Sequence, residues 1–145
     1  MPSPKTPPVK VRATSAKEVS VLAWIQDAYG NVLLIQQTAG KQIWSLPGGK
    51  VHSREPLKRA LKRELKEEIG LTVTSSEIID IFDRPAKAAL AVLFQATLRK
   101  GRLKLRDGEI QKVAFVDKLP AQATPSVRHF WKRQFPSRTR SLPSD

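Results

Sequence analysis

The chain has 145 residues, 40% of them hydrophobic, no cysteine and a formal net charge of +13. This length fits one domain with a buried core, while the absence of cysteine excludes disulfide and thiolate chemistry. No apolar run approaches the roughly 20 residues of a membrane span, and the N-terminus lacks a signal-peptide region, so we expect a cytoplasmic protein with no membrane partner and a charge that favours polyanions.

The first third of the chain predicts a tail, two strands and a glycine-containing loop. Residues 1–16 contain four prolines and no acid, which indicates a flexible basic tail. The apolar segments 18–26 and 32–37 flank the turn sequence DAYGN and predict a β-hairpin. Residues 38–42 are expected to be a loop, and residues 43–51 combine short strand character with a Pro-Gly-Gly break.

The remaining chain predicts a central helix, more strands and a last helix. A helical pattern runs from Pro56 to Ile69, because proline suits a first turn and Gly70 suits the position after the end. The other expected elements are strand–turn–strand over 71–83, a strand buried on both faces over 88–98, a basic turn region over 99–109, a strand over 110–116, a helix over 124–135 capped by Thr124, and a flexible tail over 136–145. This order predicts an α/β domain over 17–135, with a mixed β-sheet and helices on its faces.

Three glutamates of the central helix, Glu64, Glu67 and Glu68, occupy unusual positions. At about 100° per residue, Glu64 and Glu68 fall within the leucine stripe and Glu67 borders it, whereas lysines and arginines fill the opposite arc. Buried unpaired carboxylates are costly, like charges at i, i+4 repel, and a helix C-terminus disfavours anions. A divalent cation such as Mg²⁺ or Mn²⁺ would relieve all three penalties, so we interpret the group as a metal site. An ordinary Arg63–Glu67 ion pair is the alternative.

The loop before the helix, LPGGKVHSRE, adds candidate contacts to a ligand. Its two glycines allow the backbone to approach a ligand closely, and the carbonyl of Gly48 is a candidate metal ligand. Lys50 and Arg54 are candidates for binding phosphate oxygens. A simple turn without any ligand is the alternative for the glycine pair.

The segment from Gly49 to Leu71 resembles the Nudix box of the Nudix hydrolases at every defining position. Glu55 follows Gly49 after five residues, and the run RELKEEIGL follows after seven more. The resemblance implies a Nudix α/β/α sandwich. It also implies a MutT-like enzyme that uses divalent ions to hydrolyse a nucleoside diphosphate linked to another moiety. The three residues before Glu55 depart from the family's commoner acid-x-Gly, which leaves the metal ligands untouched.

The resemblance also implies roles for individual residues. The implied metal ligands are Gly48 through its carbonyl, Glu64, Glu67 and Glu68. Glu64 is in addition a candidate base, and Glu55 with Arg63 resembles the ion pair that holds the loop to the helix. Glu109, outside the box, matches a further family acid that binds metal through water or acts as a base, with an exposed turn acid as the alternative.

Substrate contacts outside the box are predicted from residue chemistry. Trp44 is a candidate to stack on a base, with a core position as the alternative, and Arg84 is a candidate phosphate contact. The run Arg99–Arg106 is a candidate polyanion contact, although we favour a solvated edge hairpin.

We expect a monomeric or homodimeric pyrophosphohydrolase of nucleoside triphosphates, oxidised ones included. The alternative substrates are dinucleoside polyphosphates and RNA 5′ ends. A non-catalytic module that binds nucleic acid is the alternative of a different class, because the strongly basic surface suits long polyanions.

Overall fold

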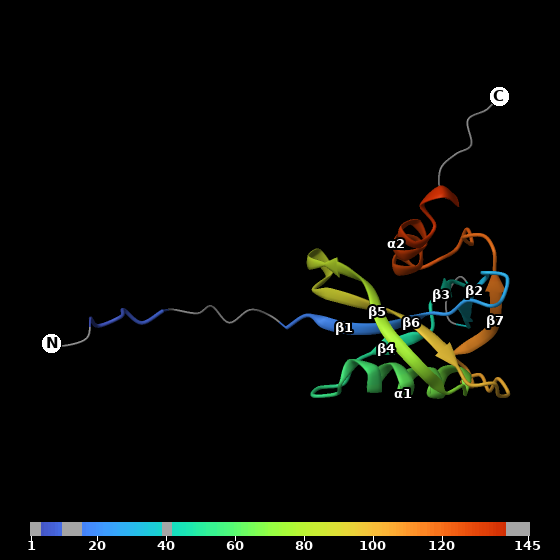
Figure 1. Ribbon diagram of the computed structural model, residues 1–145, viewed down its shortest axis with the longest axis horizontal. Helices are drawn as coiled ribbons and strands as arrows, with labels where there is room; N and C mark the ends of the chain where they lie inside the picture. Colours follow the sequence, from blue (N-terminus) through green and yellow to red (C-terminus); the bar gives the residue numbers. More distant parts are fainter. Residues whose placement is uncertain (1–3, 10–15, 39–41, 139–145) are drawn as a thin grey trace, which may run out of the picture.

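Figure 1 shows the computed structural model of the chain, which describes residues 4–9, 16–38 and 42–138. Its elements in order are β1 (Glu18–Trp24), β2 (Val32–Gln37), β3 (Trp44–Ser45), β4 (Gly48–Lys50), α1 (Leu57–Ile69), β5 (Val73–Arg84), η1 (Pro85–Lys87), β6 (Ala89–Leu98), β7 (Ile110–Val116), α2 (Pro125–Gln134) and η2 (Pro136–Arg138). Three predicted segments lie partly outside the described residues, namely the tails 1–16 and 136–145 and the loop 38–42. None of the described helices is long and apolar enough to cross a bilayer.

The strands form two sheets, with the orders β4-β1-β6-β5 and β3-β2-β7. β1 pairs with β6 in parallel, and the other strand pairs are antiparallel, so the larger sheet is mixed. Figure 1 shows α1 on one side of the strands and α2 on the other. The predicted α/β class and the sandwich of helix, sheet and helix are therefore confirmed.

Two hydrophobic cores hold these layers together, one beneath each helix. Strand β6 serves both, because Val92 and Phe94 pack in the α1 core while the alternating Ala91 and Leu93 pack in the α2 core. Strand β2 divides its side chains between the two cores in the same way. The prediction that the segment 88–98 is buried on both faces is thus confirmed for its central residues.

Both helices lie where the sequence predicts them. Gly70 ends α1 with a left-handed φ of 75°, and Pro56 precedes its first residue as the N-cap. In α2 the Thr124 hydroxyl accepts a hydrogen bond from the backbone N–H of Val127 at 3.3 Å. These local signals place α1 beside β4 and direct the N-terminal end of α2 toward the strands.

The predicted hairpin of segments 18–26 and 32–37 is wrong beyond its turn. The turn forms, since the Asp27 carboxylate accepts the N–H of Asn31 at 2.9 Å. β1 and β2 then separate into different sheets and are joined by the bridge between Gln26 and Val32. β1 and β2 each face both hydrophobic cores, and each pairs with different strands of its own sheet. These pairings outweigh the closeness of β1 and β2 in the sequence.

The predicted strand–turn–strand over 71–83 is also wrong, because β5 is continuous over 12 residues. Its pairing with β6 shifts register between Val73 and Ser75 and between Ile78 and Asp80. The polar residues that suggested a turn are exposed on this edge strand, where the Thr74 and Ser75 hydroxyls lie 3.0 and 2.6 Å from the Thr97 hydroxyl.

The favoured edge hairpin at Arg99–Arg106 is wrong as well. β6 and β7 belong to different sheets, and the segment between them folds back onto the C-terminal end of α1. The N–H of Lys104 donates to the carbonyl of Ile69 at 2.9 Å, and the N–H of Arg106 donates to the carbonyl of Glu68 at 2.9 Å. The segment therefore satisfies two of the terminal carbonyls of the helix.

Candidate active site

Glu64 and Glu68 lie on the inner face of α1, and each is only 8% exposed. Their neighbours along this face include the fully buried Leu61 and Leu65. Glu67 borders the same face and keeps 41% of its side chain exposed. The helical geometry expected from the sequence is confirmed, with two carboxylates inside the apolar stripe and one at its margin.

The glycine pair of β4 lies directly against these two carboxylates. The N–H of Gly48 donates to Oε1 of Glu68 at 2.6 Å. A Cβ atom at Gly49 would lie 2.5 Å from the carboxylate of Glu64, and one at Gly48 would lie 2.0 Å from the carbonyl oxygen of Val21. Glycine is required at both positions, because a side chain at Gly49 would clash with the helix and one at Gly48 would clash with the neighbouring strand β1.

Arg63 connects the loop to the helix. Its guanidinium binds Glu55 through two hydrogen bonds of 2.8 and 2.9 Å, and it donates to the carbonyl of Lys50 at 2.9 Å. It also contacts Glu64 at 2.9 Å and Glu67 at 3.2 Å. These bonds lower the pKa of Glu55 to about 2, so this carboxylate stays charged over the whole physiological range. The expected Glu55–Arg63 ion pair is present, and so is the Arg63–Glu67 pair that was the alternative to a metal site.

Arg106 is a residue that the sequence reasoning missed. Its guanidinium lies 2.7 Å from the carboxylate of Glu67 and 3.0 Å from that of Glu109. It thereby brings Glu109 toward the helix, although the Glu109 side chain remains 64% exposed. The sequence signal for these contacts was the position of Arg106 three residues before the candidate acid Glu109. It was overlooked because Arg106 belongs to a run of basic residues that was expected to face solvent.

The two buried carboxylates have different surroundings. The pKa of Glu68 is raised from 4.5 to about 8, mainly by burial and in part by the nearby charge of Glu64, while the N–H of Gly48 opposes the rise. Glu64 instead accepts the Arg63 guanidinium. Among the described residues, no cationic side chain forms an ion pair with Glu68, and the charge of Arg106 acts on it only from a distance.

A cleft of about 280 Å³ opens beside Glu68 and Gly48. Of the predicted substrate contacts, Arg84 lines it. Trp44 packs against the α2 core and is not among the lining residues. Lys50 points toward Glu18 at the rim, 3.3 Å away, and Arg54 is exposed on the loop before α1 with a φ of 65°.

The cleft also has polar lining residues that the sequence reasoning did not select. They are Glu18, Ser20, Gln37, Ser45, Thr124 and Ser126. Thr124 was recognised only as a helix cap, and the others lie in strands or, for Ser126, in the first turn of α2, without a motif. Their approach to Glu68 depends on the pairing of the strands, which no local pattern encodes.

The carboxylates are oxygen donors of the kind that hard divalent cations prefer. Within the described residues no three acidic, histidine or cysteine side chains are grouped as a metal site. Glu64 and Glu67 accept arginine N–H groups, and Glu68 accepts a backbone N–H. The chemistry of the donors therefore fits a divalent ion, provided that these hydrogen bonds are exchanged when it binds.

Proteins with similar sequences carry the names of nucleotide hydrolases. The chain is 36% identical over 84 residues to the 8-oxo-dGTP diphosphatase of Buchnera aphidicola, a match that covers 58% of this chain and 65% of the relative. It is 38% identical over 66 residues to the CTP pyrophosphohydrolase of Escherichia coli, covering 43% of this chain and 49% of the relative. A match to the RNA pyrophosphohydrolase of Teredinibacter turnerae, at 35% identity, covers 39% of this chain and 33% of that protein. The chain thus spans less than two thirds of the length of these three relatives.

Solved structures have the same fold. The MutT NUDIX hydrolase from Burkholderia pseudomallei superposes with a TM-score of 0.71 at 26% identity, covering 79% of this chain and 95% of that chain. The Escherichia coli ORF135 protein superposes with a TM-score of 0.64 at 25% identity, covering 90% and 97%. The NUDIX domain model matches residues 16–135, which is most of the sequence, and the chain therefore belongs to the NUDIX family.

Proposed function

We propose that this protein hydrolyses a phosphoric anhydride bond in a nucleoside diphosphate linked to another moiety. Nucleoside triphosphates, oxidised ones included, are the proposed substrates, in keeping with the names of the similar diphosphatases. The observation that carries the proposal is the buried pair Glu64 and Glu68, held against Gly48 and Gly49 at the edge of a cleft. A buried pair of acids is unfavourable for stability and suits a cationic reaction centre.

Nudix hydrolases generally need a divalent metal, and we assign Mg²⁺ or Mn²⁺ to this chain. The proposed ligands are Gly48 through its carbonyl, Glu64, Glu67 and Glu68. When bound, such an ion would neutralise the charge of the diphosphate and lower the pKa of a water molecule bound to it. The raised pKa of Glu68 fits this role, because a nearby dication would favour its charged form.

The proposed hydrolysis joins a water oxygen to phosphorus and breaks the bond from phosphorus to the bridging oxygen. Glu64 is the proposed base that accepts the proton of the water, and Arg63 holds its carboxylate in place at 2.9 Å. Glu109 is the alternative base, and it reaches the group through its contact with Arg106. Arg84 in the cleft is the proposed phosphate contact.

Lys50, Arg54 and Trp44 have weaker support as substrate contacts. Lys50 lies beside Glu18 of the cleft, and Arg54 is exposed on the loop between β4 and α1. Trp44 reaches a substrate only if its packing against the α2 core changes. RNA 5′ ends are the second candidate substrate, because the net charge of +13 favours longer polyanions.

The test is a turnover assay on a panel of nucleoside triphosphates, oxidised nucleotides, dinucleoside polyphosphates and 5′-triphosphorylated RNA. Wild type is measured with Mg²⁺, with Mn²⁺ and with a chelator, beside Glu64→Gln and Glu68→Gln. Glu77→Gln, an exposed acid of β5, is the matched control. We expect metal-dependent turnover that falls roughly a thousandfold in the two site variants and is unchanged in the control.

Absence of turnover on every diphosphate compound would contradict the proposed activity. Turnover that survives in both site variants would instead contradict the assignment of Glu64 and Glu68. Turnover of RNA alone would select the second candidate substrate.

A further inference from the structure

The outer face of α1 carries a row of cations without acidic partners. Lys58, Arg59, Lys62 and Lys66 are all exposed. None of the four forms an ion pair with another residue in the described part of the chain. The ammonium of Lys66 donates to the carbonyl of Gly70 at 3.3 Å. The face also exposes no large apolar side chain.

Helix stability does not explain this row. Lys58 and Arg59 lie in the first turn, where the helix dipole is positive, and that turn contains no acid. Lysines at positions 58, 62 and 66 are like charges at i, i+4 spacing, which destabilises a helix by about 0.2–0.5 kcal/mol for each pair. Lys66 is favoured by its place in the last turn, but no acid of the described residues pairs with Lys58, Arg59 or Lys62, so an external anion is the natural partner of this row.

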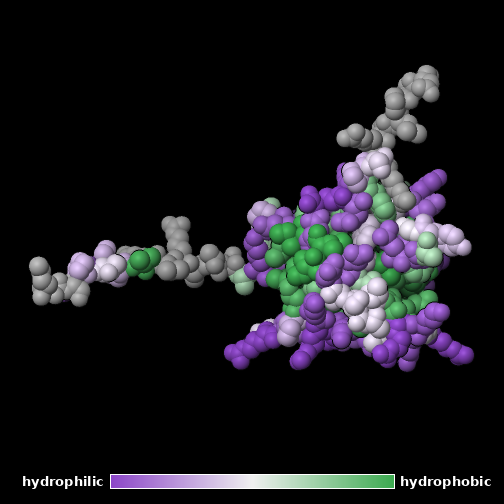
Figure 2. Space-filling model, viewed as in Figure 1, coloured by the Kyte–Doolittle hydropathy of each residue, from purple (hydrophilic) through white to green (hydrophobic). Residues whose placement is uncertain are grey.

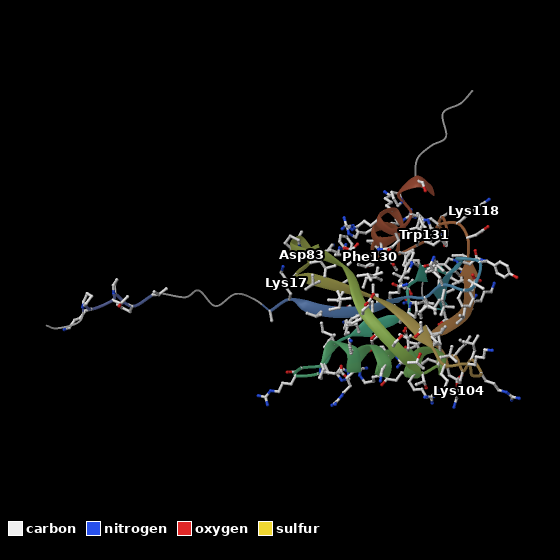
Figure 3. The ribbon with its side chains drawn as sticks, in the orientation of Figure 1. Lys17, Asp83, Lys104, Lys118, Phe130 and Trp131 are labelled. Atoms are coloured by element: carbon white, nitrogen blue, oxygen red, sulfur yellow. The ribbon has the colours of Figure 1, made fainter. Side chains whose placement is uncertain are left out.

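The row continues beyond the helix through the segment that docks on its end. Lys66 shares a groove with Arg102, Lys104 and Arg106, and these four cations outnumber the two acids that also line it, Glu67 and Asp107. We call Lys58, Arg59, Lys62, Lys66, Arg102 and Lys104 the cationic ridge. Figure 2 shows hydrophilic side chains projecting along the lower edge of the body, where Figure 1 places α1. Figure 3 shows Lys104 on this side and Lys118 on the opposite side, near α2.

We propose that the cationic ridge binds single-stranded nucleic acid through its phosphates. Successive lysines at i, i+4 lie about 6 Å apart along the helix, so they form a regular line of charges like the phosphates of an extended strand. Beside this line runs a groove of about 430 Å³. It is lined by Thr74, Ser75 and Ser76, polar residues of β5 whose chemistry suits phosphate or sugar oxygens once the Thr74 and Ser75 hydroxyls exchange their contacts with Thr97. At its other end the ridge reaches Arg106 and the acidic group.

This proposal is independent of turnover, because it concerns the outer face of α1 and not its carboxylates. The test measures binding of fluorescent single-stranded RNA and DNA of mixed sequence across a range of salt concentrations. The ridge variant combines Lys58→Gln, Lys62→Gln and Lys66→Gln. The matched control combines Lys87→Gln, Lys118→Gln and Lys132→Gln, three exposed lysines of other segments with the same change in net charge.

If each ridge lysine neutralises one phosphate, the slope of log affinity against log salt concentration should fall by about two units in the ridge variant. Binding at 0.1 M salt should weaken about a hundredfold, with a much smaller change in the control. Circular dichroism and thermal melting check that both variants remain folded.

Three outcomes would overturn the proposal. The first is equal losses in the ridge and control variants, which would mean that net charge alone attracts the strand. The second is no measurable binding by wild type. The third is ridge-dependent binding to vesicles that contain phosphatidylserine without ridge-dependent binding of oligonucleotides, which would assign the surface to a membrane.

Discussion

The two faces of α1 both break the rules of helix stability, but the fold treats them differently. On the inner face, Glu64 and Glu68 receive an arginine and a backbone N–H from neighbouring residues and strands. On the outer face, Lys58 and Lys62 receive no ion-pair partner among the described residues. The destabilising effect of the buried carboxylates is partly offset by these hydrogen bonds, which indicates a site built into the protein. The repulsion among the exposed lysines is not offset by such bonds, which indicates a partner from outside.

The largest expected effect concerns the inner face and pH. The pKa of Glu68 is raised from 4.5 to about 8, so the folded state favours its protonated form. The stability that this preference provides is present below pH 4.5 and is lost as the pH rises through 8. Between pH 5 and 8.5, we expect the metal-free protein to lose about 3–5 kcal/mol of unfolding free energy.

Urea denaturation in the presence of a chelator measures this loss. Glu68→Gln should remove most of the pH dependence, while Glu77→Gln, on the exposed surface of β5, should keep it. A Glu68→Gln protein with the same pH dependence as wild type would show that another group titrates.

The next effect tests how closely the inner face is packed. Gly48→Ala should lower the free energy of unfolding by about 3 kcal/mol or more, because the new Cβ would lie 2.0 Å from the carbonyl oxygen of Val21. Gly108→Ala also has a left-handed φ, of 76°, but no described atom lies within 4 Å, so it should cost only about 1 kcal/mol. Chemical denaturation compares them, and equal losses would mean that backbone conformation alone governs both sites.

A smaller effect on stability distinguishes the ion-paired Arg63 of α1 from Arg59 on its outer face. Arg63→Gln should lower the free energy of unfolding by about 2 kcal/mol, because Glu55 and Glu64 lose a charged hydrogen-bond partner. Arg59→Gln on the outer face should change it by less than about 0.5 kcal/mol. Thermal melting of the two single variants checks the difference, and a larger loss in Arg59→Gln would reverse the assignment of the faces.

The smallest effect has the opposite sign. Lys58→Glu should raise the free energy of unfolding by about 0.5 kcal/mol, because an acid suits the first turn of a helix and relieves repulsion with Lys62. Lys132→Glu, in the last turn of α2, should lower it by a similar amount. Both changes should shrink in 1 M salt. If Lys58→Glu destabilises the protein, then the outer face contributes to stability and the argument for an external anion weakens.

The sequence predicted those parts of the fold that depend on local periodicity and end signals. The limits of both helices, the burial of Glu64 and Glu68, and the turn at DAYGN follow from residues within one or two turns of each other. The strand pairing of β1, β2 and β5 was missed, because it depends on which of two cores each face meets. The hydroxyl contacts of Thr97 show how polar residues at an exposed edge can resemble a turn.

The candidate site divides in the same way. The glutamates, the glycine pair and the Glu55–Arg63 ion pair lie within 23 residues of sequence, where helical periodicity predicts the first and the resemblance to the Nudix box implies the last. Arg106 lies 39 residues beyond Glu67 and reaches it only because its segment binds the end of α1. Ser20 and Thr124 meet at the cleft from opposite parts of the chain. Local patterns carry no information about such approaches.

The contact between Arg106 and Glu67 has a consequence for how any metal affinity should be interpreted. The Glu67 carboxylate accepts one guanidinium from its own helix and another from the segment after β6. A dication that uses this carboxylate competes with a cation already in place, so the observed affinity equals the intrinsic one reduced by the free energy of displacing Arg106. The guanidinium released in that exchange is a positive charge beside the acidic group, where it could pair with an anionic group of the proposed substrates.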